Sequence, residues 1–276
     1  MTVNDLLRHL SRELDQDSAS PVADAKYLLA KALGVTPGML LARAYVDVDN
    51  ATRSQVETWL ERRKKGEPIA YILESAGFWT FELEVNPATL IPRPESELFI
   101  EYILENVDQA VCQCADWGTG SGAIAIALAL EKPSWTIFAS DLSKQALLTA
   151  SKNAACLDAE VQFWLSDWGA AYANSSLDII VSNPPYIRDN DEHLGQGDLR
   201  FEPRSALASG ADGLDAIRQL IKDATRCLKP GGLLLIEHGF DQGAAVQILL
   251  QQNGFKKTQQ LKDLAGHDRI SLGSLK

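Results

Sequence analysis

The chain has 276 residues, 46% of them hydrophobic, so it can bury the core of one large domain or of a medium-sized domain with a small companion. Its formal net charge is −11 at pH 7, and its bases form only one run, of four residues at positions 62–65. Binding to a phosphate backbone requires clustered bases, so this composition argues against a protein that binds nucleic acid directly.

The compartment is indicated by the N-terminus and the cysteines. The N-terminus is polar and acidic rather than a basic segment followed by an apolar run, and no stretch of about 18 apolar residues occurs. The cysteines have no C-x-x-C spacing, which is typical of core thiols rather than of metal ligands; they are Cys112, Cys114, Cys156 and Cys227. We therefore expect a soluble, cytoplasmic protein that binds no metal and no membrane.

The first 74 residues have the apolar spacing of amphipathic helices. The two clearest stripes are Val3, Leu6, Leu7, Leu10 and Leu14, and then Val22, Ala25, Leu28, Leu29, Ala32 and Leu33. Ser20 and Pro21 are typical of a helix start, Gly34 is typical of a helix end, and Asn50 can cap the helix that stops at Gly66. These signals predict a small helical bundle.

The charge of this bundle is nearly balanced. Residues 1–74 carry 11 acidic and 10 basic side chains, which leaves −10 of the net charge to the rest of the chain. The four bases at 62–65 fall at a helix end, where cations suit the dipole and are solvated. Because residues 1–74 contain no catalytic cluster, we interpret them as a module that docks the substrate or stabilises the fold.

Residues 75–90 change to a strand pattern. Aromatic and apolar residues dominate positions 78–85 and alternate towards the end, and Asn86-Pro87 indicates a turn. This predicts a β-hairpin that links the bundle to a second domain over residues 91–276. Glu95 and Glu97 are most simply acids in the first turn of that domain's first helix, and the sequence gives them and Arg93 no further role.

A glycine-rich turn follows the next strand. Residues 111–116 predict a strand and residues 123–130 an apolar helix, and between them stand Gly118, Thr119, Gly120, Ser121 and Gly122. Glycines let a backbone approach a ligand, and a helix N-terminus adds positive potential. The spacing is G-x-G-x-G rather than the dinucleotide pattern, and Asp116 just before it favours a cationic or amino-bearing ligand. A tight turn without a ligand is the alternative.

Two further strands end in acidic residues. The strand at 135–140 ends at Asp141, 19 residues past Gly122, where a ribose-binding acid belongs in a βαβ unit. The strand at 161–165 leads to Asp167, which can accept from an exocyclic amino group, and to Trp168, which can pack on a ring. The alternatives are a helix cap for Asp141, a turn cap for Asp167 and a core position for Trp168.

The fourth strand, at 177–181, ends at Asn183, Pro184, Pro185 and Tyr186. The prolines keep the backbone extended and lack N–H groups, so this corner offers the Asn183 side-chain oxygen and the Pro184 carbonyl as acceptors. A planar NH2 group fits two such acceptors, and Tyr186 supplies a flat ring beside it. Four strand ends of this kind at one edge of a sheet predict a ligand site rather than four unrelated turns.

The remaining elements complete an α/β pattern. After a polar loop at 187–204, we expect a helix at 214–228, a turn at 229–232, a strand at 233–237, a helix at 242–252 and strands near 255–261 and 269–272. Seven strands with intervening helices predict a doubly wound, Rossmann-like sheet.

This order of motifs resembles the S-adenosylmethionine-dependent methyltransferases that modify planar nitrogen, and more narrowly the release factor glutamine N5-methyltransferases, the PrmC/HemK family. The resemblance covers nearly the whole chain. It is carried by Ile91-Pro92-Arg93-Pro94-Glu95, Ser166-Asp167-Trp168, Val181-Ser182-Asn183-Pro184-Pro185-Tyr186-Ile187 and Arg200-Phe201-Glu202-Pro203. Trp117 replaces a usual aliphatic residue, and Ser121 and Ser96 stand where Thr is common.

The resemblance implies a Rossmann-like methyltransferase domain, S-adenosylmethionine as cofactor, and the glutamine of the Gly-Gly-Gln motif of class 1 release factors as substrate. It implies that the cofactor site takes Asp116, Gly118, Thr119, Gly120, Ser121, Gly122, Asp141, Asp167, Trp168 and Asn183, and that Asn183, Pro184, Pro185 and Tyr186 hold the amide. The first alternative is an adenine N6-methyltransferase acting on nucleic acid, which the acidic charge disfavours. The second is a binding module without activity, which would not be expected to keep Asn183 and the glycines.

Overall fold

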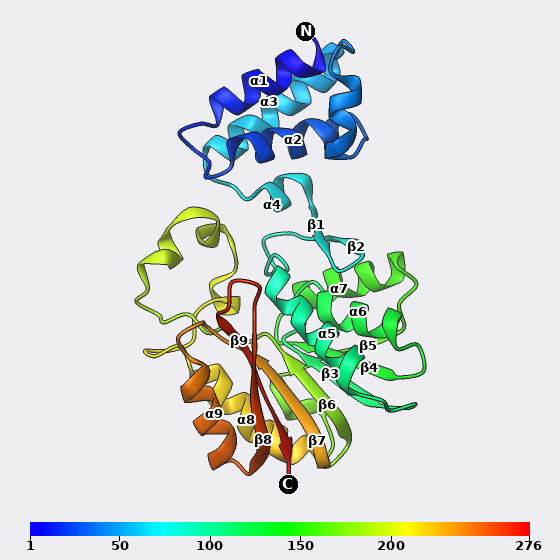
Figure 1. The fold of residues 1–276 in the computed structure, drawn as a ribbon, viewed down its shortest axis with the longest axis vertical. Coiled ribbons are helices and arrows are strands. Elements are labelled where there is room, and N and C mark those ends of the chain that lie inside the picture. The colour runs from blue at the N-terminus through cyan, green and yellow to red at the C-terminus, as the bar shows by residue number, and fades with distance from the viewer. The chain divides into compact units, whose positions relative to one another are not determined.

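The computed structural model describes residues 1–276, and the chain divides into two compact units. The first unit contains Met1–Ser75 together with Gly197–Phe201, and the second contains Ala76–Gln196 together with Glu202–Lys276. Figure 1 shows the helices of the first unit in blue and cyan and the sheet of the second in green to red. No helix of the chain is both long and apolar enough to cross a bilayer.

The first unit is a helical bundle, as the sequence predicts. Its helices are α1 (Val3–Glu13), α2 (Pro21–Ala32), α3 (Asn50–Lys64) and the short α4 (Ile69–Leu73), with a 3-10 helix η1 (Pro37–Arg43) before α3. The predicted stripes form its core, which includes Leu6, Leu10, Leu28, Leu29, Val56 and Leu60. Val22 was expected in that stripe but is exposed, because it falls in the first turn of α2 on the solvent side.

One predicted helix start is confirmed and one is wrong by a residue. Ser20 is the N-cap of α2 and Pro21 opens the helix, although the Ser20 hydroxyl donates to Asp24 and caps no backbone N–H. At α3 the cap is Asp49, which accepts from the Thr52 backbone N–H at 2.9 Å, and Asn50 is the first helical residue. Asp and Asn are equally good caps, so the sequence alone could not choose between neighbours.

The base run at the end of α3 is not simply solvated. Arg63 is only 8% exposed and donates to Asp24 at 2.7 Å and to Asp198 at 2.8 Å. The Arg200 guanidinium likewise donates to the Lys65 carbonyl at 2.6 Å. These bonds attach Gly197–Phe201, a segment of the predicted polar loop, to the bundle.

The second unit begins with a two-stranded hairpin, β1 (Ser75–Phe78) and β2 (Phe81–Glu84), as predicted. Its main sheet has seven strands in the order β5-β4-β3-β6-β7-β9-β8. The strands are β3 (Gln113–Trp117), β4 (Thr136–Asp141), β5 (Val161–Leu165), β6 (Leu177–Ser182), β7 (Leu228–Glu237), β8 (Phe255–Lys262) and β9 (Asp268–Leu275). The first five are parallel and β9 is antiparallel to both neighbours, so the predicted doubly wound, Rossmann-like sheet is confirmed.

Helices cover both faces of this sheet (Figure 1). On one face lie α5 (Glu97–Asn106), α6 (Ala123–Glu131) and α7 (Lys144–Cys156), and on the other α8 (Asp215–Cys227) and α9 (Gly243–Gln252). Side chains alternate between the two cores along each strand: Cys114 enters one, and Ala115 and Trp117 enter the other. Short 3-10 helices lie before α5 (η2, Pro94–Ser96), after β5 (η3, Trp168–Ala171) and in the loop before α8 (η4, Glu192–Gly195; η5, Gly197–Phe201; η6, Arg204–Ala206).

Two strand predictions need correction. The expected turn at 229–232 is part of β7, whose pairing with β6 shifts between Leu228 and Leu233, so the glycines form an irregularity within a strand. The strand expected from 111 starts only at Gln113, and Val111 is exposed. Glycine and proline indicate irregular backbone, but they do not distinguish a bulge from a turn.

Chain order reverses between β3 and β6, because the chain first adds β4 and β5 on one side of β3 and then returns to add β6 on the other. Ligands of open α/β sheets bind at the carboxyl ends of the strands beside such a reversal. The fold therefore predicts a ligand site at the carboxyl ends of β3, β4, β5 and β6.

Candidate active site

A cavity of about 530 Å³ lies at these strand ends, a size typical of small-molecule sites. The structure brings together there most of the residues that the sequence predicts: Gly118, Thr119, Gly120 and Ser121 after β3, Asp141 at the end of β4, Asp167 and Trp168 after β5, and Asn183 and Pro185 after β6. Asp116, Gly122, Pro184 and Tyr186 belong to the same strand ends but do not line the cavity.

The glycine turn has the geometry that requires glycine. Gly118, Gly120 and Gly122 have φ angles of 74°, 57° and 88°, in the left-handed region. A Cβ on Gly122 would lie 3.1 Å from the Ala150 Cβ, so this glycine lets α6 pack on α7. A Cβ on Gly120 would meet no atom within 4 Å and would project into open space beside the cavity. The turn thus forms a cradle, an open space beside the backbone that larger side chains in place of glycine would occupy.

Asp116 lies beneath this turn. Its Oδ2 accepts from the Thr119 hydroxyl at 2.6 Å, whereas its buried Oδ1 has no partner in the protein. Burial raises the pKa of Asp116 to about 7. Its carboxylate therefore holds the turn through Thr119, and direct contact with a ligand stays a prediction.

Asp141 presents its carboxylate to the cavity from the end of β4. Its Oδ2 accepts from the Gly120 backbone N–H at 3.0 Å and its Oδ1 from the Ser143 N–H at 2.8 Å. Each oxygen keeps a lone pair for a further donor, such as a hydroxyl. The helix-cap alternative fails, because Ser143 caps α7 by accepting from Ala146. Burial raises the pKa of Asp141.

Trp168 and Asp167 form the wall after β5. The Trp168 ring packs on the turn, since a Cβ on Gly118 would lie 3.5 Å from its Cζ3. Trp168 has a φ of 42°, a strained value for a bulky residue, which indicates that its neighbours hold it in place. Asp167 precedes η3 but its side chain caps nothing there, so its carboxylate is free to accept from a ligand.

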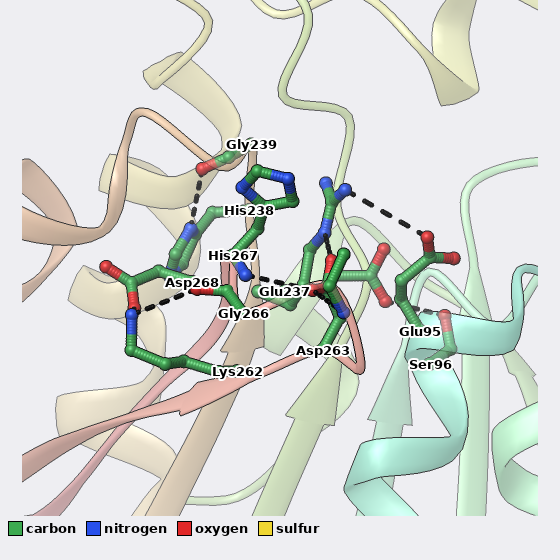
Figure 2. Close-up of polar contacts among 12 residues, drawn as sticks. Glu95, Ser96, Glu237, His238, Gly239, Lys262, Asp263, Gly266, His267 and Asp268 are labelled. Carbon is green, nitrogen blue, oxygen red and sulfur yellow. Dashed lines mark hydrogen bonds and ion pairs between the residues drawn. The ribbon is translucent and has the colours of Figure 1, made fainter.

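Asn183 is held by a chain of hydrogen bonds that the sequence does not reveal. Its Nδ2 donates to Ser96 Oγ at 3.1 Å. Ser96 Oγ in turn donates to Glu237 Oε2 at 2.6 Å (Figure 2). The Tyr186 hydroxyl donates to Glu237 Oε1 at 3.4 Å, so this ring points towards the carboxylate. No protein group donates to Asn183 Oδ1 or to the Pro184 carbonyl. The corner thus keeps the two acceptors that the sequence predicts.

Ser96 and Glu237 were missed as site residues. Glu237 ends β7, and an acid at the end of a buried strand is the same signal that singled out Asp141, so the sequence could have indicated it. Ser96 carries no comparable signal. Arg93, whose role the sequence left open, lines the cavity and pairs with the buried Glu202, which also accepts from the Ile91 N–H at 2.9 Å.

The comparisons with known proteins cover most of the chain. The PrmC N-terminal domain family matches residues 5–73, and the methyltransferase small domain family matches residues 94–198. A release factor glutamine methyltransferase of Neisseria gonorrhoeae is 46% identical over 258 residues, which are 93% of this chain and 94% of that protein. One of Coxiella burnetii is 40% identical over 272 residues, 98% of each chain.

The chain belongs to the release factor glutamine methyltransferase family. The predicted resemblance to this family is therefore confirmed. Among solved structures, the 16S rRNA N2 G1207 methyltransferase of T. thermophilus, in complex with AdoMet and guanosine, aligns with a TM-score of 0.56. It is 21% identical and covers 73% of this chain and 50% of its own, so this likeness supports the fold alone.

Proposed function

We propose that the protein transfers the methyl group of S-adenosylmethionine to the side-chain amide nitrogen of the glutamine in the Gly-Gly-Gln motif of class 1 release factors. The observation that carries this proposal is the pair of unpartnered acceptors, Asn183 Oδ1 and the Pro184 carbonyl, next to a cavity of cofactor size in a member of this family. Because release factors act on ribosomes, we also propose that the enzyme is cytoplasmic.

The residues of the cavity fit S-adenosylmethionine. The Gly120 cradle admits a ligand close to the backbone, Asp141 can accept from ribose hydroxyls, and Trp168 offers a ring face beside the turn. Asp167 can accept from the adenine amino group or its neighbours. When bound, the cofactor supplies an electrophilic methyl group on a positively charged sulfur.

The contribution of the chain is to orient a weak nucleophile. A glutamine nitrogen shares its lone pair with the carbonyl, and it is not deprotonated at neutral pH. We assign Asn183 Oδ1 and the Pro184 carbonyl to the two amide hydrogens, which aims the nitrogen along one line at the methyl group. Preorganised acceptors of this kind lower the barrier without a strong base, because the proton leaves after the nitrogen has been alkylated.

The adenine alternative is not favoured. Most of the charge of −11 lies outside the bundle, and the relatives are named for release factors and not for nucleic acids. A flipped base would require a basic groove for its backbone.

The test of the function is transfer of labelled methyl from S-adenosylmethionine to a purified class 1 release factor. We expect label on the wild-type factor and none on a factor whose Gly-Gly-Gln glutamine is replaced by alanine. DNA and RNA serve as controls. Label on nucleic acid, or label on the alanine variant of the factor, would contradict the proposal.

Asp141→Ala tests the cofactor assignment. Hydrogen bonds to a charged group contribute about 1.5–3 kcal/mol, so we expect the Kd for S-adenosylmethionine to rise by roughly 10- to 150-fold in calorimetry. Asp178→Ala is a matched control, because Asp178 lies on β6 away from the cavity and pairs with Lys229. An unchanged Kd for Asp141→Ala would rule out the ribose assignment.

A further inference from the structure

The direction of the Asn183 side chain decides whether the proposed reaction can occur. An amide presents an oxygen on one side and an NH2 group on the other, and only the oxygen can accept a hydrogen from the substrate glutamine. A rotation of 180° would turn Nδ2 towards the cavity and make Asn183 repel the NH2 group it has to orient. Something must therefore fix the amide.

The hydrogen bonds from Asn183 to Ser96 and from Ser96 to Glu237 fix the amide, because the Ser96 hydroxyl has only one hydrogen to donate. Ser96 Oγ carries one hydrogen, and the 2.6 Å contact with Glu237 Oε2 takes it, because a carboxylate can only accept. Ser96 is then left with lone pairs towards Asn183, and these can bind Nδ2 but not Oδ1. The same bonds that satisfy Ser96 thus leave Oδ1 facing the cavity.

We propose that Glu237, acting through Ser96, is a positioning residue that fixes the Asn183 amide with its oxygen towards the substrate. This rests on the proposed role of Asn183 in orienting the glutamine. Both partners are built into the core: Glu237 is 1% and Ser96 4% exposed, and they come from β7 and from the 3-10 helix before α5 (Figure 2).

The charge of Glu237 decides which group donates and which accepts in the hydrogen bonds between Glu237, Ser96 and Asn183. Its pKa is raised to about 7, chiefly by burial and also by the nearby Glu95, although the bonds from Ser96 and Tyr186 and the charge of Arg269 lower it. A protonated Glu237 can donate to Ser96, which frees the Ser96 hydrogen for Asn183 Oδ1 and allows the inverted amide. Because the carboxylate exists above the pKa, kcat should fall as the pH drops below about 7.

Ser96→Ala removes the hydroxyl that links Glu237 to Asn183 and should lower kcat by about 10- to 100-fold, as loss of a supporting hydrogen bond commonly does. Since Ser96 acts through Asn183, the loss should vanish when Asn183→Ala is already present. Ser96→Thr keeps the hydroxyl and should restore most of the rate. Ser271→Ala is the matched control, because it removes a buried hydroxyl that bonds to His238 rather than to Asn183, and its effects should add to those of Asn183→Ala.

Two further measurements complement the kinetics of Ser96→Ala: the first does not use that variant, and the second does not require turnover. Glu237→Gln cannot ionise, so the acid limb of its kcat against pH should become smaller; Asp116, whose pKa is also about 7, can still contribute to it. In the cofactor-free protein, NMR should show the Asn183 Nδ2 hydrogens protected from exchange in the wild type and more exposed in Ser96→Ala.

The outcomes separate this inference from the proposed function. Additive losses for Ser96→Ala and Asn183→Ala, or an acid limb of unchanged size in Glu237→Gln, would overturn the positioning role of Glu237 and Ser96 and leave the role of Asn183 intact. If Asn183→Ala itself kept full activity, the proposed role of Asn183 would be wrong. The positioning role of Glu237 and Ser96, which depends on it, would then be wrong as well.

Discussion

Asn183→Ala should lower kcat on a purified release factor by about 100- to 1,000-fold, the usual effect of removing one preorganised polar group from an active site. The substitution deletes one of the two acceptors while the cradle around Gly120 and the carboxylate of Asp141 remain. The Kd for S-adenosylmethionine should therefore change much less than kcat. Steady-state kinetics and calorimetry on the same preparation measure both quantities.

Asn190→Ala is a suitable control for this prediction, because Asn190 is an exposed asparagine in the loop that follows Tyr186. It should leave kcat and the Kd unchanged. If the Asn183 variant turned over within a few-fold of the wild type, Asn183 would not be the group that orients the amide.

The sequence predicts the cavity well because its residues follow from a local rule. Asp141, Asp167 and Asn183 each come directly after a short apolar strand, and parallel strands bring their carboxyl ends to one edge of the sheet. Knowing the strands is then enough to know which side chains meet, even though the expected bounds of β3 and β7 were wrong.

The hydrogen-bond chain behind Asn183 could not be predicted in the same way. Ser96 and Glu237 are 141 residues apart, and their contact depends on how α5 and its leading turn pack beside β7. Similarly, Arg63 and Asp198 are 135 residues apart, and a pattern of bases at a helix end does not indicate a buried partner. Local patterns establish which residues end a strand, whereas tertiary packing decides which distant groups support them.

After Asn183, we expect the helical bundle at residues 1–74 to have the largest effect on activity. It has its own hydrophobic core and no catalytic group, and a short glutamine loop alone buries too little surface for a stable protein complex. A second contact made by the bundle would raise the effective concentration of that loop at Asn183. We therefore propose that residues 1–74 dock the release factor.

A chain that begins at Ser75 should test this role, because the sheet and all the residues that line the cavity remain in it. We expect it to unfold cooperatively and to bind S-adenosylmethionine with a similar Kd. On an intact release factor its kcat/KM should fall by about 100-fold, whereas on a short Gly-Gly-Gln peptide, which never made the second contact, it should fall less than about threefold.

The full-length variant Asp198→Ala with Arg200→Ala controls for the loop, because the bundle normally holds Gly197–Phe201 through Arg63 and the Lys65 carbonyl. It releases that segment but keeps the bundle, and Arg63 retains its bond to Asp24. If this variant lost as much activity as the shortened chain, the loss would come from the loop. If the shortened chain lost equal activity on protein and peptide, the bundle would support the fold instead of docking the substrate.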